Sequence, residues 1–101
     1  MDITKEEAAE AIRLWGTEAQ TATFIEEMGE FLQAWNKLRR EAITKEDYVS
    51  EIADVYIMVQ QMIHIHREVF DKVYPTKLAK IRAKLARYQE IEKGYKELLE
   101  K

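Results

Sequence analysis

The sequence contains no cysteine, a single proline and three glycines in 101 residues. Without cysteine there can be no disulfide and no thiolate metal site, and the chain suits a reducing compartment, so we expect a cytoplasmic protein. Hydrophobic residues make up 47% and charged residues 35% of the chain, a balance that excludes general disorder and is typical of a folded helical protein. We expect disorder only in the last few residues.

Long apolar runs and a strong net charge are also missing. The most apolar stretch, residues 52–65, is interrupted by Asp54, Gln60, Gln61 and His64, so we expect no membrane span of about 20 residues. The first ten residues are acidic and lack the apolar segment of a secretory signal. The net charge is −3 with basic residues spread along the chain, which predicts no nucleic-acid partner.

Helix start signals and apolar spacing predict four helices and no strand. Three patterns resemble capping boxes: Thr4 with Glu7, Thr17 with Gln20, and Thr44 with Asp47. Gly16 is predicted to end the first helix, the second is predicted to reach about Glu41, and the third to end near Phe70 or Asp71. Pro75 is tolerated in the first turn of a helix and so is predicted to mark the entry to the fourth.

The second, third and fourth predicted helices each carry apolar residues at three-four spacing along one side. These stripes predict an all-α protein, a compact antiparallel four-helix bundle in which residues 1–101 form one domain. A chain of this length covers such stripes only in part, so we expect a homodimer or a dimer of dimers.

Four acidic residues lie at these apolar stripes. At about 100° per residue, Glu27 falls at the border of the second helix's stripe with Glu30 beside it, while Glu26 points to the opposite side. Glu51 falls inside the stripe of the third helix, and Asp54 lies at its edge. A buried carboxylate is normally protonated, paired or metal-bound. If the two pairs converge they require a cation, and oxygen ligands alone favour Mg²⁺, with Mn²⁺ as a substitute.

The alternative interpretation is a solvated acidic face, because glutamate is a good helix former and acidic pairs at this spacing are common. Either pair alone favours that interpretation, but the two together, with Glu51 on an apolar face, favour a metal site. A di-iron bundle is disfavoured, since His64 and His66 point in different directions and no Glu-x-x-His motif is present.

The segments Glu26-Glu27-Met28-Gly29-Glu30 and Glu51-Ile52-Ala53-Asp54 resemble the EExxE and ExxD signature of the MazG-like superfamily of nucleoside triphosphate pyrophosphohydrolases, which also includes the dimeric all-helical dUTPases. The similarity extends to the Leu14-Trp15-Gly16 turn, to Gln20 and to Lys77-Leu78, and so covers about residues 10–88.

This resemblance implies that Glu27, Glu30, Glu51 and Asp54 bind Mg²⁺ and that the protein hydrolyses an NTP or dNTP to the monophosphate and pyrophosphate. The ion would neutralise and orient the triphosphate and lower the pKa of a water for in-line attack. The water's proton could go to Glu26 or to a ligand carboxylate such as Glu27, and the sequence does not choose between them.

Further residues could contact the nucleotide. The predicted fourth helix places basic residues on one side, next to its apolar stripe, and we expect these to bind phosphate: Lys77, Lys80 and Lys84, with Arg87 open to the same role. Trp15 and Gln20 are the candidates for base or sugar contacts. For Phe31 and Trp35 we favour core packing. The competing function, from another class, is a non-catalytic helical module for dimerisation or interaction.

Overall fold

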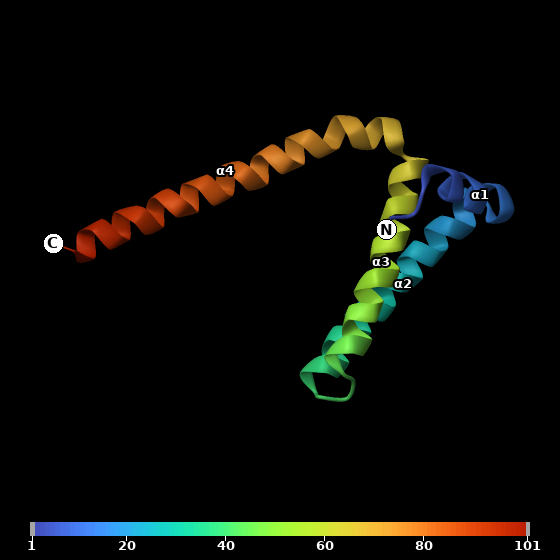
Figure 1. The fold of residues 1–101 in the computed structure, drawn as a ribbon, viewed down its shortest axis with the longest axis horizontal. Coiled ribbons are helices and arrows are strands. Elements are labelled where there is room, and N and C mark those ends of the chain that lie inside the picture. Colours follow the sequence, from blue (N-terminus) through green and yellow to red (C-terminus); the bar gives the residue numbers. More distant parts are fainter. Residues whose placement is uncertain (1, 101) are drawn as a thin grey trace. The chain divides into compact units, whose positions relative to one another are not determined.

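The structure is a computed structural model that describes residues 2–100. Four α-helices follow one another along this part of the chain (Figure 1): α1 Lys5–Trp15, α2 Thr17–Arg39, α3 Lys45–Ile65 and α4 Arg67–Leu99. The predicted all-α fold is confirmed, and residues 2–100 contain no strand. No helix among them is long and apolar enough to cross a membrane. The chain divides between Arg67 and Glu68 into two compact units, which are described separately.

Two of the three predicted capping boxes are present. At the start of α1, the amide of Glu7 donates to the Thr4 hydroxyl (3.0 Å) and the amide of Thr4 donates to the Glu7 carboxylate (2.9 Å). Thr44 and Asp47 exchange the same two bonds, both 3.1 Å, at the start of α3. Such caps contribute about 1 kcal/mol each. Gly16 ends α1 as predicted, at a φ of +86° that favours glycine.

The third predicted capping box, Thr17 with Gln20, is wrong. Thr17 is the first residue of α2, Gly16 occupies the cap position, and no side chain caps this end. The Gln20 side chain instead donates from Nε2 to Oε1 of Gln61 on α3. A side chain engaged across the helix interface cannot also reach back to its own helix start.

The second helix ends at Arg39, slightly before the predicted end at Glu41. Glu41 has a φ of +60°, so it lies in the left-handed region that ends many helices. The amide of Glu41 donates to the carbonyl of Leu38 (3.0 Å), and the amide of Ala42 donates to that of Lys37 (2.8 Å). These two bonds form a Schellman motif in which glutamate replaces the usual glycine.

The predicted boundary between the third and fourth helices is also wrong. The third helix ends at Ile65, and His66, with φ −111° and ψ 30°, separates it from α4. Pro75 therefore lies inside α4 and not in its first turn, although a proline inside a helix costs roughly 3 kcal/mol. The apolar pattern runs through this boundary without a glycine or proline, so sequence alone places the break too late.

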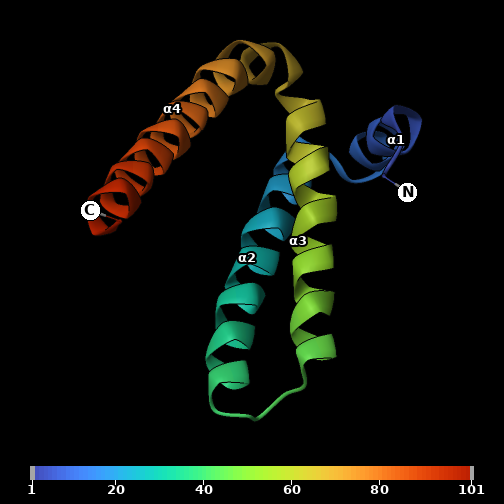
Figure 2. The ribbon, with the colours of Figure 1, turned by 60° about the vertical axis from the view of Figure 1, so that its left-hand side comes forward.

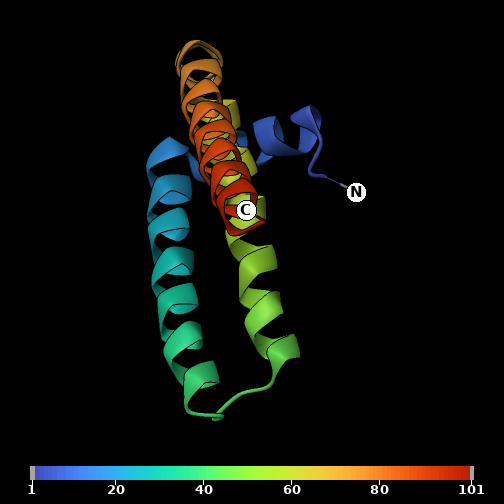
Figure 3. The same cartoon turned by 90° about the vertical axis from the view of Figure 1, so that its left-hand side faces the viewer.

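Helices α2 and α3 form an antiparallel hairpin (Figure 2), and α1 packs against both helices near the end away from their connecting loop (Figure 3). The buried apolar residues of this unit are small or flexible: Ala8, Ala11, Ala34 and Met58. Several residues of the predicted stripes stay exposed, among them Ile25 at 59% and Leu32 at 63%. The hairpin therefore buries one face of each helix and leaves other apolar side chains at the surface.

The fourth helix, described by itself, contains no buried residue. Most of its predicted apolar stripe is exposed, including Ile81, Leu85, Tyr88 and Ile91. It continues past Gly94 to Leu99. The predicted disorder of the last few residues falls partly on Lys101, which lies outside the described residues. The four-helix bundle and the oligomer stay predictions.

Candidate metal centre

The acidic residues of α2 and α3 meet in the middle of the hairpin interface. Glu27 and Glu51 are half-buried, whereas Asp54 is exposed. One carboxylate oxygen from each of these three residues lies within 4.8 Å of the others. The i,i+3 spacing of Glu51 and Asp54 places both on the side of α3 that faces Glu27.

Two oxygens of this cluster are buried without hydrogen bonds. Glu27 Oε2 and Glu51 Oε2 have no hydrogen-bond partner within the described part of the chain. A buried polar atom without a partner costs about 1–3 kcal/mol, and more when it carries charge. These oxygens therefore have unused acceptor capacity directed into the protein.

The environment of Glu27 opposes its ionisation. Burial raises the pKa of Glu27 above its ordinary value, and the negative charges of Glu30 and Asp54, hydrogen bonding with Glu30 and the charge of Glu51 act in the same direction. A cation bound here would lower the pKa of Glu27 instead. Its positive charge would favour the ionised form of the carboxylates that now repel one another.

Glu30, the fourth predicted ligand, lies beside the cluster. Its negative charge contributes to the raised pKa of Glu27, but Glu30 is not part of the three-residue group. Instead, Glu30 and Glu51 both line a cavity of about 420 Å³ between α2 and α3. The structure thus brings Glu27, Glu51 and Asp54 together and places Glu30 at the edge of the same interface.

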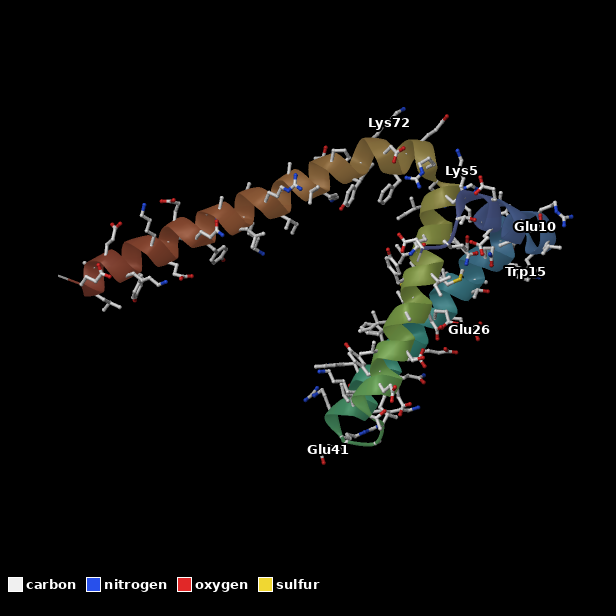
Figure 4. All side chains as sticks on the ribbon, viewed as in Figure 1. Lys5, Glu10, Trp15, Glu26, Glu41 and Lys72 are labelled. Atoms are coloured by element: carbon white, nitrogen blue, oxygen red, sulfur yellow. The ribbon has the colours of Figure 1, made fainter. Side chains whose placement is uncertain are left out.

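Glu26, the first acid of the motif, is exposed on α2 (Figure 4). Its position agrees with the helical projection, which directs it away from Glu27. Any role in proton transfer would have to be exercised from the surface, since Glu26 does not belong to the three-residue carboxylate group.

Two groups of contacts define the interface, one on either side of the cluster. Toward α1, Gln20 and Gln61 are 4% and 7% exposed and hydrogen-bond each other, and Gln61 Nε2 donates to the sulfur of Met58 (3.4 Å). Toward the loop, the ring of Tyr48 contacts Phe31 (5.5 Å between centroids) and Trp35 (5.9 Å). Phe31 is half-buried against α3, as predicted, whereas Trp35 contacts Tyr48 but is 47% exposed and so is not a core residue.

The residues predicted to contact nucleotide are distributed over both units. Trp15 is 64% exposed at the end of α1 (Figure 4), whereas Gln20 is buried and paired with Gln61. The predicted phosphate-binding residues Lys77, Lys80 and Lys84 are exposed on α4, in the other unit. Arg87, on the same helix, places its guanidinium 5.6 Å from the ring centre of Tyr88.

Sequence reasoning missed several residues near the cluster. Lys37, Asp47 and Ser50 line the cavity that Glu30 and Glu51 share. Lys37 follows Glu30 by seven residues, a spacing that returns to the same side of a helix, so its position was available from the sequence. His64 lines a separate cavity of about 520 Å³ at the end of the hairpin near α1, which contains none of the four predicted ligands.

The donor set fits a hard divalent cation. Every contributing group is a carboxylate, two buried oxygens lack partners, and oxygen ligands are those that Mg²⁺ and Mn²⁺ prefer. Comparison of the chain with protein-family models, with curated proteins and with solved structures finds no match. The residues themselves are therefore the basis on which a function can be inferred.

Proposed function

We propose that this protein is a Mg²⁺-dependent nucleoside triphosphate pyrophosphohydrolase of the MazG-like kind, which converts an NTP or dNTP to the monophosphate and pyrophosphate. The observation that supports this most is the convergence of Glu27, Glu51 and Asp54 between α2 and α3, with buried carboxylate oxygens that lack partners. These residues belong to the EExxE and ExxD segments on which the resemblance depends.

In this proposal Glu27, Glu51 and Asp54 hold the ion, and Glu30 completes the set from the edge of the interface. When bound, Mg²⁺ supplies charge neutralisation of the triphosphate and activation of the attacking water. The residues of the chain keep the carboxylates in place: the Gln20–Gln61 pair on one side and the Phe31–Tyr48 contact on the other fix the two helices relative to each other.

Binding of the substrate needs positive charge as well as the ion. Lys77, Lys80 and Lys84 remain the proposed phosphate-binding residues of α4, and the exposed Trp15 is proposed for the base or sugar. Gln20, predicted for the same role, is instead buried and bonded to Gln61, so it serves the helix interface. The exposed apolar stripe of α4 and the exposed Ile25 and Leu32 of α2 support association of chains, and we propose a dimer or a dimer of dimers of four-helix bundles.

A second candidate function is a helical interaction module without catalysis. The same exposed apolar residues favour it, because large exposed apolar surfaces often mark interaction sites. It gives no reason, however, for carboxylates with buried, unpartnered oxygens in a helix interface. The enzyme is therefore the better-supported proposal.

The test is release of monophosphate and pyrophosphate from a panel of NTPs and dNTPs with Mg²⁺, comparing the native chain, Glu51→Gln and Glu46→Gln. Glu46 is an exposed acid in the first turn of the same helix, so its variant controls for loss of one charge. We expect activity with native protein and Glu46→Gln, and a loss of at least about 100-fold in Glu51→Gln. Absence of cleavage of every nucleotide, together with absence of Mg²⁺ binding, would favour the interaction module.

A further inference from the structure

The cavity between α2 and α3 is lined by three acidic residues, Glu30, Asp47 and Glu51, and by one basic residue, Lys37. Glu30 and Glu51 line it beside the carboxylate cluster, and Lys37 lines it toward the loop. Lys37 follows Glu30 by seven positions, which is a distance of about 10 Å along the helix axis. The cavity thus connects the carboxylate cluster to the ammonium group of Lys37, on the same side of α2.

Among residues 2–100, Lys37 is the only basic residue that lines this cavity. It forms no ion pair in the described portion of the structure, although Asp47 lines the same space. The carboxylate of Asp47 accepts the Thr44 amide at the start of α3, so it already has a structural role. The ammonium group of Lys37 therefore remains available to an anion that enters from solvent.

The same lysine also borders a second cavity, of about 590 Å³, on the outer side of α2. Gln33 and Lys37 line both cavities, and Arg39 and Arg40 line only the second. Three basic residues therefore gather at the end of α2, with Asp47 of the first cavity as the acidic residue on the facing helix. An anion with several charges is better accommodated here than beside the carboxylate cluster.

We propose that Lys37 binds the pyrophosphate portion of the substrate, so that the α2–α3 hairpin itself supplies a phosphate-binding group next to its carboxylates. This inference rests on the proposed function, since it takes the cluster to act at the phosphorus nearest the sugar. The two outer phosphates then extend along α2 to Lys37. A lysine ammonium suits this role as a compact charge that donates three hydrogen bonds to phosphate oxygens.

The experiment compares native protein with Lys37→Gln, Lys37→Arg and the matched control Lys45→Gln. Lys45 is an exposed lysine at the start of α3 that lines neither cavity, so its variant removes the same charge from the same hairpin. The readouts are KM for the preferred nucleotide, inhibition by inorganic pyrophosphate with Mg²⁺, inhibition by the nucleoside monophosphate, and direct binding of Mn²⁺ without nucleotide.

We expect Lys37→Gln to weaken pyrophosphate inhibition and to raise KM by about tenfold, the usual effect of losing one charge-assisted contact. Monophosphate inhibition and Mn²⁺ binding should stay within about twofold of native. Lys37→Arg should keep most of the pyrophosphate affinity because it keeps the charge, and Lys45→Gln should match native in every readout.

Three results would overturn the assignment of Lys37. The first is equal pyrophosphate affinity in Lys37→Gln and Lys45→Gln, the second is a selective loss of monophosphate affinity, and the third is failure of Lys37→Arg to keep the affinity that Lys37→Gln loses. Each leaves the proposed function standing if native protein binds Mn²⁺ and cleaves nucleotide. A native protein that binds no Mn²⁺ and cleaves nothing would instead overturn the proposed function together with this subsite.

Discussion

Glu27 on α2 and Glu51 on α3 approach each other across the hairpin interface, with one carboxylate oxygen of each within 4.8 Å. Each residue also keeps a buried Oε2 that has no hydrogen-bond partner among residues 2–100. Two like charges in this arrangement destabilise the metal-free protein. The proposed ion would relieve this repulsion when it binds, and a preformed set of unpaired carboxylates attracts a cation strongly.

The first prediction concerns stability without metal. We expect Glu27→Gln to raise the free energy of unfolding of the metal-free protein by about 1 kcal/mol, because it removes a charge whose burial and neighbours oppose ionisation. Chemical denaturation in the presence of EDTA measures this. Glu26→Gln, an exposed neighbour with the same change in charge, should have little effect. Equal effects of the two variants would show that Glu27 carries no special penalty.

The second prediction concerns the buried amide pair. Gln20→Ala should lower the free energy of unfolding by about 1–3 kcal/mol, because Oε1 of Gln61 then loses its hydrogen-bond donor in the interface. Replacing both residues with leucine should be less damaging than the sum of the two single leucine replacements, since no polar group is left unpaired. A double-mutant cycle followed by thermal unfolding measures the coupling, and strict additivity would contradict it.

The third prediction concerns the left-handed residue that ends α2. Glu41→Gly should stabilise the protein by about 1 kcal/mol, because glycine adopts a φ of +60° without the clash of a side chain. Glu41→Ala keeps the side-chain clash and separates this effect from loss of charge. If the alanine variant gains as much as the glycine variant, backbone strain is not the cause.

The fourth prediction concerns pH and the capping box of α1. Hydrogen bonds with the backbone and hydroxyl of Thr4 lower the pKa of Glu7 below its ordinary value of 4.5. A carboxyl whose pKa is lower in the folded state than in the unfolded state stabilises the folded state at pH values above the unfolded-state pKa. This contribution is lost as the pH falls through the folded-state pKa. Between pH 6 and pH 3, native protein should therefore lose more stability than Glu7→Gln. Thermal unfolding at each pH measures this, with Glu6→Gln as the exposed control.

Local signals in the sequence were sufficient for some parts of the fold. Thr4 and Thr44 cap their helices as predicted, and Gly16 ends α1, because each depends on residues within one turn. The predictions at Thr17 and Pro75 were wrong for the opposite reason. The side chain of Gln20 is committed to a residue 41 positions away, and the break at His66 has no glycine or proline to mark it.

The candidate site was predictable to a similar degree. Helical periodicity placed Glu27 and Glu51 toward the interior, and both are half-buried in the interface. Periodicity fixes the direction of a side chain but not the offset between two packed helices, so it could not separate Glu30 from the three residues that converge. Nor could it reveal the cavity that connects Glu51 to Lys37, because that space depends on how α2 and α3 pack.

The most direct test of the central claim is a titration of metal-free protein with Mn²⁺, followed by electron paramagnetic resonance and displaced by Mg²⁺. Native protein should bind Mn²⁺, Mg²⁺ should displace it, and Glu51→Gln should reduce the affinity by at least about tenfold while remaining helical. Glu46→Gln should bind as native protein does. Native protein that binds no Mn²⁺, or that binds it equally well after Glu51→Gln, would contradict a metal centre between α2 and α3.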